Sequence, residues 1–373
     1  LGTVETWHFD NTGDKDKILT VEDLGDVGWI NFEEAFQGCS NLTTFNGGNT
    51  SAVTNMAKMF QNADLVTPDT SGWETHNVTT MSAMFWGAQA ATPVTTTSGN
   101  IWKTSSVTNM YGMFYYAVSA NPDVSGWETH NVTTMGSMFY NANSATPVTT
   151  TSGNIWNTSS VTNMSYMFGS ADLANPDVSG WETHNVTLMN DMFDSAASAT
   201  PVTTTSGNVW NTSSVTTMAE MFKGADLANP DVSGWETHNV TDMGSMFESA
   251  DVATPVTTTS GNVWNTSSVI LMDRMFRNAP LANPDVSGWE THNVTDMSGM
   301  FRYAYAAVPV TATSGNVWNT SSVTNMNGMF FEANLANPDV SGWETHNVTD
   351  MASMFYGADI AIPNTATSGN VWN

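Results

Sequence analysis

One eleven-residue pattern recurs twelve times along the chain. Its Val-x-x-Met-x-x-Met-Phe core begins at Val53, Val78, Val107, Val132, Val161, Val186, Val215, Val240, Val269, Val294, Val323 and Val348. The intervals between these valines alternate strictly between 25 and 29 residues. A fixed period of this kind is typical of a solenoid, in which each coil packs only on its neighbours. The 373-residue chain is therefore predicted to be one elongated array and not a set of globular domains.

Each copy of the pattern carries apolar residues at helical spacing. In the copy at 161–171 the apolar residues are Val161, Met164, Met167, Phe168 and Ala171. This spacing places them on one stripe of a helix, and polar residues that cap helices stand near its start. The pattern predicts a short helical or 3₁₀ segment of about two to three turns.

A second fixed element lies between these segments. The 25-residue coils carry Asn-Pro-Asp-Val-Ser-Gly-Trp-Glu-Thr-His-Asn, as at 175–185. The 29-residue coils carry Thr-Pro-Val-Thr-Thr-Thr-Ser-Gly-Asn-Ile-Trp-Asn-Thr-Ser-Ser, as at 146–160. A β-branched segment that is opened by proline and turned by glycine predicts a strand. The predicted fold class is a repeat solenoid of short parallel strands and short helical or 3₁₀ segments, in coils of alternating length.

The aromatic and sulfur-containing residues are the candidate core. Twelve tryptophans from Trp73 to Trp372 recur in register, and all 24 methionines belong to the Met-x-x-Met-Phe cores. Residues that repeat in every coil favour a stacked core over a cofactor site. The core prediction is made specifically for Trp127, Trp156, Trp181, Trp210, Trp235, Trp264, Met164, Met167 and Phe168.

The chain divides into three predicted parts. Residues 1–28 do not fit the repeat, and their acidic, polar character is typical of a cap on a solenoid end. Residues 29–50 form a degenerate capping repeat, in which Cys39 takes the place of the small apolar residue. Residues 51–373 form the tandem array of twelve coils, the last of which is incomplete, so we expect the natural chain to continue past Asn373.

Charge and cysteine content exclude several classes of protein. Eight Lys and Arg stand against 35 Asp and Glu, and the net charge of −27 opposes binding to nucleic acid or anionic lipid. The chain contains no run of 18 apolar residues, so no membrane insertion is predicted within this segment. Cys39 is the only cysteine, which excludes an intramolecular disulfide. An acidic surface rich in Thr, Asn and Ser favours an extracellular or cell-surface location.

The repeat resembles a known family. The stretch Trp181-Glu-Thr-His-Asn-Val-Thr-Leu-Met-Asn-Asp-Met-Phe-Asp-Ser-Ala196 is similar to the repeat of BspA-like, leucine-rich-repeat-type bacterial surface proteins, and so is Glu34-Ala-Phe-Gln-Gly-Cys-Ser-Asn-Leu42. The resemblance covers residues 29–373. It implies a leucine-rich-repeat-like, right-handed coil, export to the cell surface, and a role in adhesion or surface structure without catalysis. The Thr-rich insert and the alternation of 25 and 29 residues depart from the plain family pattern.

Asparagine recurs immediately before the valine of each 25-residue coil. These residues are Asn77, Asn131, Asn185, Asn239, Asn293 and Asn347. Buried backbone groups need partners, so the asparagines are predicted to form a structural ladder of hydrogen bonds from coil to coil.

Few residues suggest a metal site. The run Asp10-Asn-Thr-Gly-Asp-Lys-Asp16 resembles half a calcium loop, which makes Asp10, Asp14 and Asp16 calcium candidates. Glu182 and His184, and their five repeats, point to one side of an extended segment. Like pairs would recur only about 10 Å apart, on every second coil, which is too far for two histidines to share a zinc ion. The Glu–His pairs are therefore predicted to face solvent.

Three functions are consistent with these features, and no catalytic, cofactor or phosphate-binding motif is present. The first is a non-enzymatic structural or adhesive stalk on the cell surface, whose partner is a host or neighbouring-cell surface. The second is a subunit of a head-to-tail extracellular filament, whose partners are copies of itself. The third is ice binding, which is suggested by the row of threonines at 203–205 and the equivalent rows in the other 29-residue coils.

Overall fold

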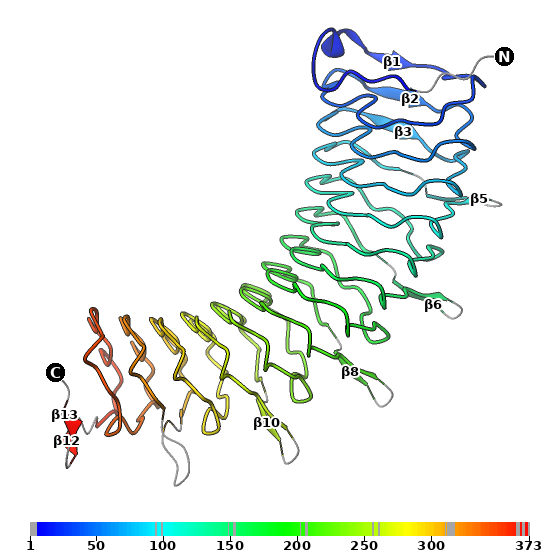
Figure 1. Cartoon of the computed structure of the whole chain (residues 1–373). Helices are drawn as coiled ribbons and strands as arrows, with labels where there is room; N and C mark the ends of the chain where they lie inside the picture. Colours follow the sequence, from blue (N-terminus) through cyan, green and yellow to red (C-terminus); the bar gives the residue numbers. More distant parts are fainter. Residues whose placement is uncertain are drawn as a thin grey trace. The chain divides into compact units, whose positions relative to one another are not determined.

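The computed structural model describes most of the chain (Figure 1). The described residues are 6–93, 95–97, 100–147, 149–151, 154–201, 203–205, 208–255, 257–259, 262–309, 311, 318–362, 366–367 and 370–371. The chain divides into two compact units, Leu1–Asn185 and Val186–Asn373, called here the first and second unit. Each unit is a stack of similar coils.

The first unit begins with the non-repeated segment. A 3₁₀ turn, η1 (Lys15–Lys17), precedes strand β1 (Thr20–Val21). Strand β1 pairs in parallel with β2 (Thr44–Asn46), and β2 pairs in parallel with β3 (Thr67–Asp69). The N-terminal segment thus supplies an outer strand, so that β2 is not an open sheet edge.

Residues 29–50 pack as a coil despite their degenerate sequence. Trp29, Phe32, Phe36 and Cys39 are all buried. The backbone N–H groups of Phe32 and Phe36 donate to carbonyl oxygens of the next coil at 2.8 Å. Apolar character at the repeated positions is therefore enough to preserve the coil, even where Met is replaced by Phe.

A parallel β-bridge joins one coil to the next in both units. Within the twelve repeats the bridged residue lies directly before the first methionine of the Met-x-x-Met-Phe-x-x-Ala stretch, called here the Met-Phe segment. The first unit contains the bridges Thr6–Asn31, Asn31–Asn55, Asn55–Thr80, Thr80–Asn109, Asn109–Thr134 and Thr134–Asn163. The second unit contains Leu188–Thr217, Thr217–Asp242, Asp242–Leu271, Leu271–Asp296, Asp296–Asn325 and Asn325–Asp350. The fold is a repeat solenoid, as the sequence predicts.

The Met-Phe segments are stacked turns, so the segment at 161–171, predicted as helical or 3₁₀, keeps single i→i−3 bonds such as Met167 N to Met164 O but forms no continuous helix. In the coil at 53–63, Lys58 N and Phe60 N donate to carbonyl oxygens of the next coil at 2.8 and 2.9 Å. Between them, Met59 N bonds back to Met56 O at 3.3 Å. A helix would need every N–H to bond within the segment, but alternate ones here bond to the neighbouring coil. Among the described residues η1 is the only helical element, and no helix is long and apolar enough to span a membrane.

The Thr-rich inserts form hairpins, so the prediction of parallel strands in them is also wrong. In the first unit β4 (Thr96–Thr97) pairs antiparallel with β5 (Asn100–Ile101), and β6 (Thr150–Thr151) with β7 (Asn154–Ile155). The second unit contains the hairpins β8 (Thr204–Thr205) with β9 (Asn208–Val209), β10 (Thr258–Thr259) with β11 (Asn262–Val263), and β12 (Ala366–Thr367) with β13 (Asn370–Val371). The four extra residues of a 29-residue coil therefore fold back on their own segment and do not extend the coil-to-coil ladder.

Stacked aromatic rings fill the interior of each unit. In the first unit Trp127 and Trp156 lie 6.3 Å apart between ring centroids, with planes inclined by 5°. In the second unit Trp210 and Trp235 lie 6.2 Å apart and are inclined by 8°. The remaining predicted core residues, Trp181, Trp264, Met164, Met167 and Phe168, are at most 1% exposed. Trp372 and Asn373 lie outside the described residues.

Candidate binding face on the stacked turns

The six repeated asparagines bond each 25-residue coil to the coil before it. Every one donates from Nδ2 to a serine carbonyl oxygen at 2.7–2.8 Å. The pairs are Asn77 with Ser51, Asn131 with Ser105, Asn185 with Ser159, Asn239 with Ser213, Asn293 with Ser267, and Asn347 with Ser321. These amide donors are occupied within the scaffold.

Threonine hydroxyls form a second set of bonds between coils. Most buried polar residues of the described chain are threonines. Thr149 Oγ1 donates to Asp177 O at 2.6 Å, and Thr203 Oγ1 donates to Asp231 O at 2.7 Å. Thr203, the first residue of the Thr row considered for ice binding, is 1% exposed and so does not reach the surface. The next two threonines form β8, and their side chains lie outside the described part of the structure.

The Glu–His pairs face solvent. His184 Nδ1 lies 4.0 Å from Glu182 Oε2, and His292 Nδ1 lies 3.9 Å from Glu290 Oε2. All four side chains are about half exposed. Such pairs contribute little to stability, since exposed ion pairs are typically worth about 0–1 kcal/mol.

The structure does not bring Asp10, Asp14 and Asp16 together as a calcium loop. Asp14 Oδ1 lies 2.8 Å from Lys17 Nζ, and Asp16 Oδ1 lies 3.0 Å from Lys15 Nζ. The hydrogen bond from Lys15 holds the pKa of the Asp16 carboxyl below its usual value. The two lysines of the run neutralise the carboxylates that a calcium ion would need.

Asp10 joins a different group. Its carboxylate lies within 4.8 Å of ligand atoms of His8 and Glu34. In the described part of the chain no other three His, Cys, Asp or Glu residues approach so closely. Lys58 Nζ lies 2.7 Å from Glu34, and this hydrogen bond lowers the pKa of the Glu34 carboxyl.

Cys39 is a packing residue. Its side chain is fully buried, and burial raises the pKa of the thiol to about 11. The thiolate is the reactive form of cysteine, so the Cys39 thiol is unreactive at neutral pH.

The chain concentrates its sequence differences at four positions in each turn. All twelve segments keep the residues written out in Met-x-x-Met-Phe-x-x-Ala, whereas the four x residues change from coil to coil. We call these the variable turn positions. They hold all three arginines of the chain and seven of its eight tyrosines.

Several of these positions carry large side chains where the backbone favours glycine. The second and fourth variable positions have positive φ angles, and glycine occupies some of them, for example Gly112 at 59°. Tyr116, Tyr166, Arg274 and Tyr303 adopt the same conformation, at 53–61°. A non-glycine residue there costs about 1–2 kcal/mol. The same conformation recurs in the other coils, for example at Lys58, Ser137 and Ser249, so it belongs to the turn itself.

In the first unit the variable turn positions form an exposed aromatic cluster. Its members are Trp86, Tyr111, Tyr115, Tyr116, Tyr140 and Tyr166. The Tyr115 ring lies 3.8 Å from that of Trp86 and 4.9 Å from that of Tyr140, between centroids, and both pairs are stacked. Tyr111, Tyr116 and Tyr166 are 38–43% exposed. Tyrosine-rich surfaces of this kind supply rigid contact area that keeps a polar group at its edge.

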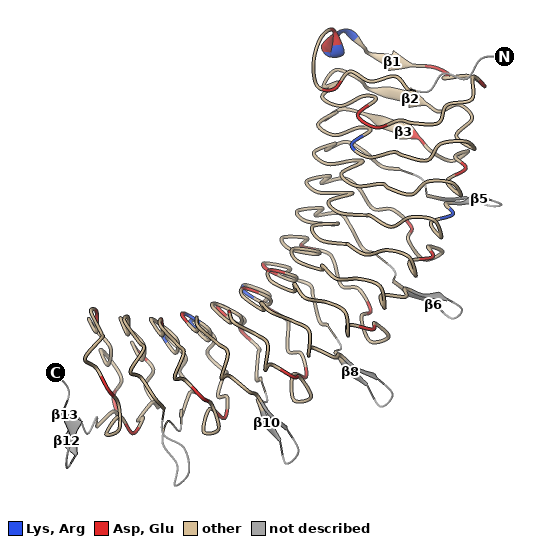
Figure 2. Ribbon diagram, viewed as in Figure 1, with Lys and Arg blue, Asp and Glu red and all other residues tan. Residues whose placement is uncertain are grey.

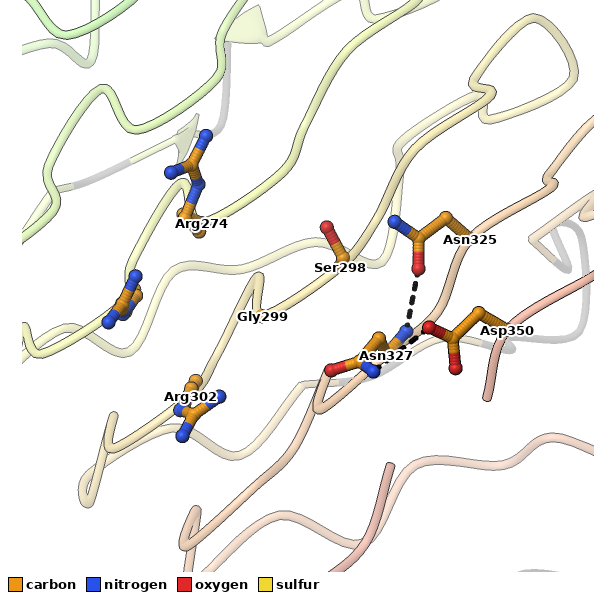
Figure 3. A pocket seen from close by; sticks show the side chains of 8 residues that line it. Arg274, Ser298, Gly299, Arg302, Asn325, Asn327 and Asp350 are labelled. Atoms are coloured by element: carbon orange, nitrogen blue, oxygen red, sulfur yellow. Dashed lines mark hydrogen bonds between the residues drawn. The ribbon is translucent and has the colours of Figure 1, made fainter. Parts of the chain in front are cut away.

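In the second unit the same positions form the arginine pocket (Figure 3). The cavity has a volume of about 320 Å³ and is lined mainly by Arg274, Arg277, Arg302, Asn325, Asn327 and Asp350. The Arg302 guanidinium carbon lies 4.4 Å from the centre of the Phe331 ring. Asn327 Nδ2 donates to Asp350 Oδ2 at 3.0 Å. The pocket gathers three of the eight Lys and Arg residues of a chain that carries 35 Asp and Glu residues (Figure 2).

The predictions from sequence did not include either surface. The repeated residues build every coil, so a prediction from them identifies the scaffold. The surfaces could have been predicted from the four positions that do not repeat. When these positions are aligned by the period of 25 and 29 residues, Arg277 and Arg302 fall on adjacent coils.

A family model described as "Mycoplasma protein of unknown function, DUF285" matches residues 30–152, 149–206, 228–311 and 311–366. These matches cover well over half of the chain. The chain belongs to the DUF285 family. The boundaries of the matches fall within the tandem array and its degenerate first repeat, so this DUF285 chain consists mostly of family repeats.

Comparisons with individual proteins are less informative. No curated protein matches the chain. Among solved structures, one chain from the "Crystal structure of TLR13-ssRNA13 complex" aligns with a TM-score of 0.29 and 10% identity. The alignment covers 91% of this DUF285 chain and 49% of the other, so this chain spans about half the length of that protein.

Proposed function

We propose that this DUF285 chain is a non-enzymatic, extracellular surface protein that adheres to a host or neighbouring-cell surface through its variable turn positions. The repeated residues provide the stalk, and the variable ones provide recognition. The BspA-like character of the repeat supports this proposal, as does the net charge of −27. A strongly acidic surface keeps such an array soluble and discourages non-specific contacts.

The contrast between scaffold and variable positions carries the proposal. Asn, Thr and Trp residues are occupied in bonds or packing between coils. The variable turn positions instead display exposed Tyr111, Tyr116 and Tyr166 and half-exposed Arg274. Repeat proteins commonly bind along such surfaces because one rigid framework presents many independent side chains.

Bead adhesion tests this proposal. Beads coated with the chain are incubated with cultured epithelial cells or with other bacteria, and bound beads are counted. We expect adhesion, and we expect it to fall several-fold when Tyr115, Tyr116 and Tyr140 are replaced by Ser. A control chain with Glu128→Gln and His130→Asn should adhere normally. Absence of adhesion to every cell type, or equal adhesion of the Tyr variant, would contradict the proposal.

Self-association is a second candidate, favoured by an apolar row in the second unit. Leu227, Val252, Leu281, Leu335 and Ile360 occupy one position of successive coils, interrupted by Ala306, and the five are 36–52% exposed. Contiguous exposed apolar surface often marks a protein interface. Because the row runs along the coils, it supports side-by-side contact between copies and not the head-to-tail contact of the filament hypothesis.

Light scattering after size exclusion distinguishes these options. Self-association predicts a mass above 40.2 kDa that increases with concentration and returns to 40.2 kDa in a Leu227→Ser, Leu281→Ser, Leu335→Ser variant. A monomer at all concentrations would leave adhesion as the proposal. For ice binding, an assay that finds no thermal hysteresis would remove the third hypothesis.

A further inference from the structure

The arginine pocket contains every arginine of the chain. Arg274 and Arg277 lie in one turn, and Arg302 lies in the next. The chain carries only eight basic residues and a net charge of −27. Three guanidinium groups therefore meet at one cavity of an acidic chain, and a guanidinium group that lacks an acidic partner attracts an anionic group.

Two of the three arginines already have acidic partners. Arg274 donates twice to Asp273 Oδ2, from Nε at 3.0 Å and from Nη2 at 2.8 Å. Arg277 Nη1 lies 3.4 Å from Glu248 Oε1. Arg302 forms no ion pair with any residue in the described ranges.

Arg302 is also held in place. Its guanidinium carbon lies 4.4 Å from the Phe331 ring centre and 5.3 Å from that of Tyr303. Its Nε is buried and finds no hydrogen-bond acceptor among the described residues. Because Nε is buried, a ligand reaches this guanidinium only at its terminal Nη groups, and planar guanidinium groups bind carboxylates through two parallel hydrogen bonds. One preoriented cation without a carboxylate fits a ligand with a single acidic group.

The rest of the lining fits hydroxyl groups. Ser298, Asn325 and Asn327 offer both donors and acceptors around the cavity, and Asp350 offers acceptors (Figure 3). Asn325 Nδ2 donates to Asp296 Oδ2 at 3.1 Å. Mixed donors and acceptors of this kind suit a polyhydroxylated molecule better than a bare anion, which would need donors only.

A second cavity lies along the same two turns. It has a volume of about 390 Å³ and is lined by Asp251, Asn278, Pro280, Tyr303 and Tyr305. Asn278 directly follows Arg277 in sequence, and Tyr303 directly follows Arg302, so neighbouring residues line the two cavities. Aromatic rings beside polar groups provide a flat apolar surface for a sugar ring. Each cavity has a volume within the range of about 300–1,000 Å³ that is usual for small-molecule sites.

From these features we propose that the arginine pocket binds an acidic saccharide, with its carboxylate on Arg302, its hydroxyl groups on Asn325, Asn327 and Asp350, and a further ring beside Tyr303 and Tyr305. This inference rests on the proposed function, since it names a ligand class for the same variable turn positions. The overall negative charge opposes long polyanions such as nucleic acids, which need many free cations.

Saturation-transfer NMR and calorimetry test the proposal with glucuronic acid, its uncharged methyl ester and inorganic phosphate. We expect the acid to bind in the millimolar range, and the ester and phosphate to bind at least tenfold more weakly. Arg302→Gln should weaken binding of the acid at least tenfold, and Arg302→Lys should weaken it less, since lysine keeps the charge but loses the planar geometry. Lys223→Gln, another basic residue of the variable turns, should leave binding unchanged. Melting curves identify any variant that does not fold.

Several outcomes would overturn the proposal. They are absence of binding by the acid, equal binding of acid and ester, phosphate binding as tight as that of the acid, or unchanged binding by Arg302→Gln. Bead adhesion separates this inference from the proposed function. A chain that adheres to cells without binding the acid contradicts the saccharide assignment alone, whereas a chain that binds the acid but does not adhere contradicts the adhesive function.

Discussion

The indole rings of Trp73 and Trp102 lie almost parallel, with centroids 5.8 Å apart and planes inclined by 2°. The first ring comes from a 25-residue coil and the second from a 29-residue coil. Trp102 Nε1 also donates to Thr70 O at 3.4 Å, as do Trp156, Trp264 and Trp318 to the equivalent carbonyl oxygens at 3.1–3.2 Å. The longer coil therefore keeps its tryptophan in register, because its extra residues leave the stack as a hairpin.

Removal of a central tryptophan should destabilise the array strongly. Trp235 is fully buried and stacks on Trp210 at 6.2 Å. We expect Trp235→Ala to lower the free energy of unfolding by about 3–5 kcal/mol, as for other buried aromatic residues. Urea unfolding followed by circular dichroism gives this value. Leu227→Ala, at a position that is 52% exposed, is the control and should change stability little. An unmoved transition for Trp235→Ala would show that the tryptophan stack is not the core.

The asparagine ladder should make a smaller contribution. Asn239 Nδ2 donates to Ser213 O at 2.8 Å and so joins two adjacent coils. A hydrogen bond of this kind contributes about 0.5–1.5 kcal/mol, so Asn239→Ala should lower stability by about that amount. Asn239→Asp keeps the size but removes the donor, and we expect at least as large a loss. If both variants melt like the parent chain, the ladder is not a source of stability.

Asp242 should make stability depend on pH. Burial raises the pKa of its carboxyl, and the nearby Asp273 adds to the effect. The folded state then binds a proton more readily than the unfolded state, so the ionised Asp242 opposes folding at neutral pH. We expect Asp242→Asn to melt at a higher temperature at pH 7. This gain should shrink as the pH falls through the raised pKa, and it should vanish below the ordinary Asp pKa of about 3.9.

Asp339 provides a control of opposite sign. Hydrogen bonds from the backbone and hydroxyl of Ser341 lower the pKa of its carboxyl. Its ionised form therefore favours folding above the unfolded pKa, and that contribution is lost as the pH falls through the lowered pKa. Asp339→Asn should not raise the melting temperature at pH 7. Equal pH profiles for Asp242→Asn and Asp339→Asn would contradict the assigned shifts.

Added ions should stabilise the whole chain. The net charge of −27 destabilises a compact state through self-repulsion, and salt screens this repulsion. We expect the melting temperature to rise with sodium chloride. Bound calcium would add a further increase by mass action that magnesium does not match. Equal responses to calcium and magnesium at matched ionic strength would indicate screening alone, whereas a melting temperature that does not rise with sodium chloride would contradict the expected self-repulsion.

The sequence predicts the core well and the turn conformation poorly. Trp, Met and Phe recur in every coil, so their burial follows from the period alone. The spacing of Val161, Met164, Met167 and Phe168 fits a helix equally well, because it also describes successive tight turns. The deciding hydrogen bonds, such as Phe139 N to Met167 O at 2.9 Å, come from the next coil. The spacing of residues within one coil does not show that the neighbouring coil supplies the hydrogen-bond acceptor.

The candidate site shows a similar division. The period of the array could have aligned Arg277 with Arg302, since both follow the Phe of adjacent turns. The placement of the Arg302 guanidinium on the Phe331 ring depends on side-chain conformation in two adjacent coils, which sequence spacing does not determine. The acidic run at 10–16 likewise suggests calcium ligands by residue type. Its sequence does not show that Lys15 pairs with Asp16 and Lys17 with Asp14.

Oxidative footprinting of the chain bound to target cells tests most directly whether the variable turn positions are the binding face. Hydroxyl radicals modify exposed Trp, Tyr and His side chains, and mass spectrometry then compares bound with free chain. We expect protection of Trp86, Tyr115 and Tyr116 in the aromatic cluster, while His130, a member of the solvent-facing Glu–His pairs, stays equally reactive. Protection of His130 together with unchanged oxidation of the aromatic cluster would contradict the proposed binding face.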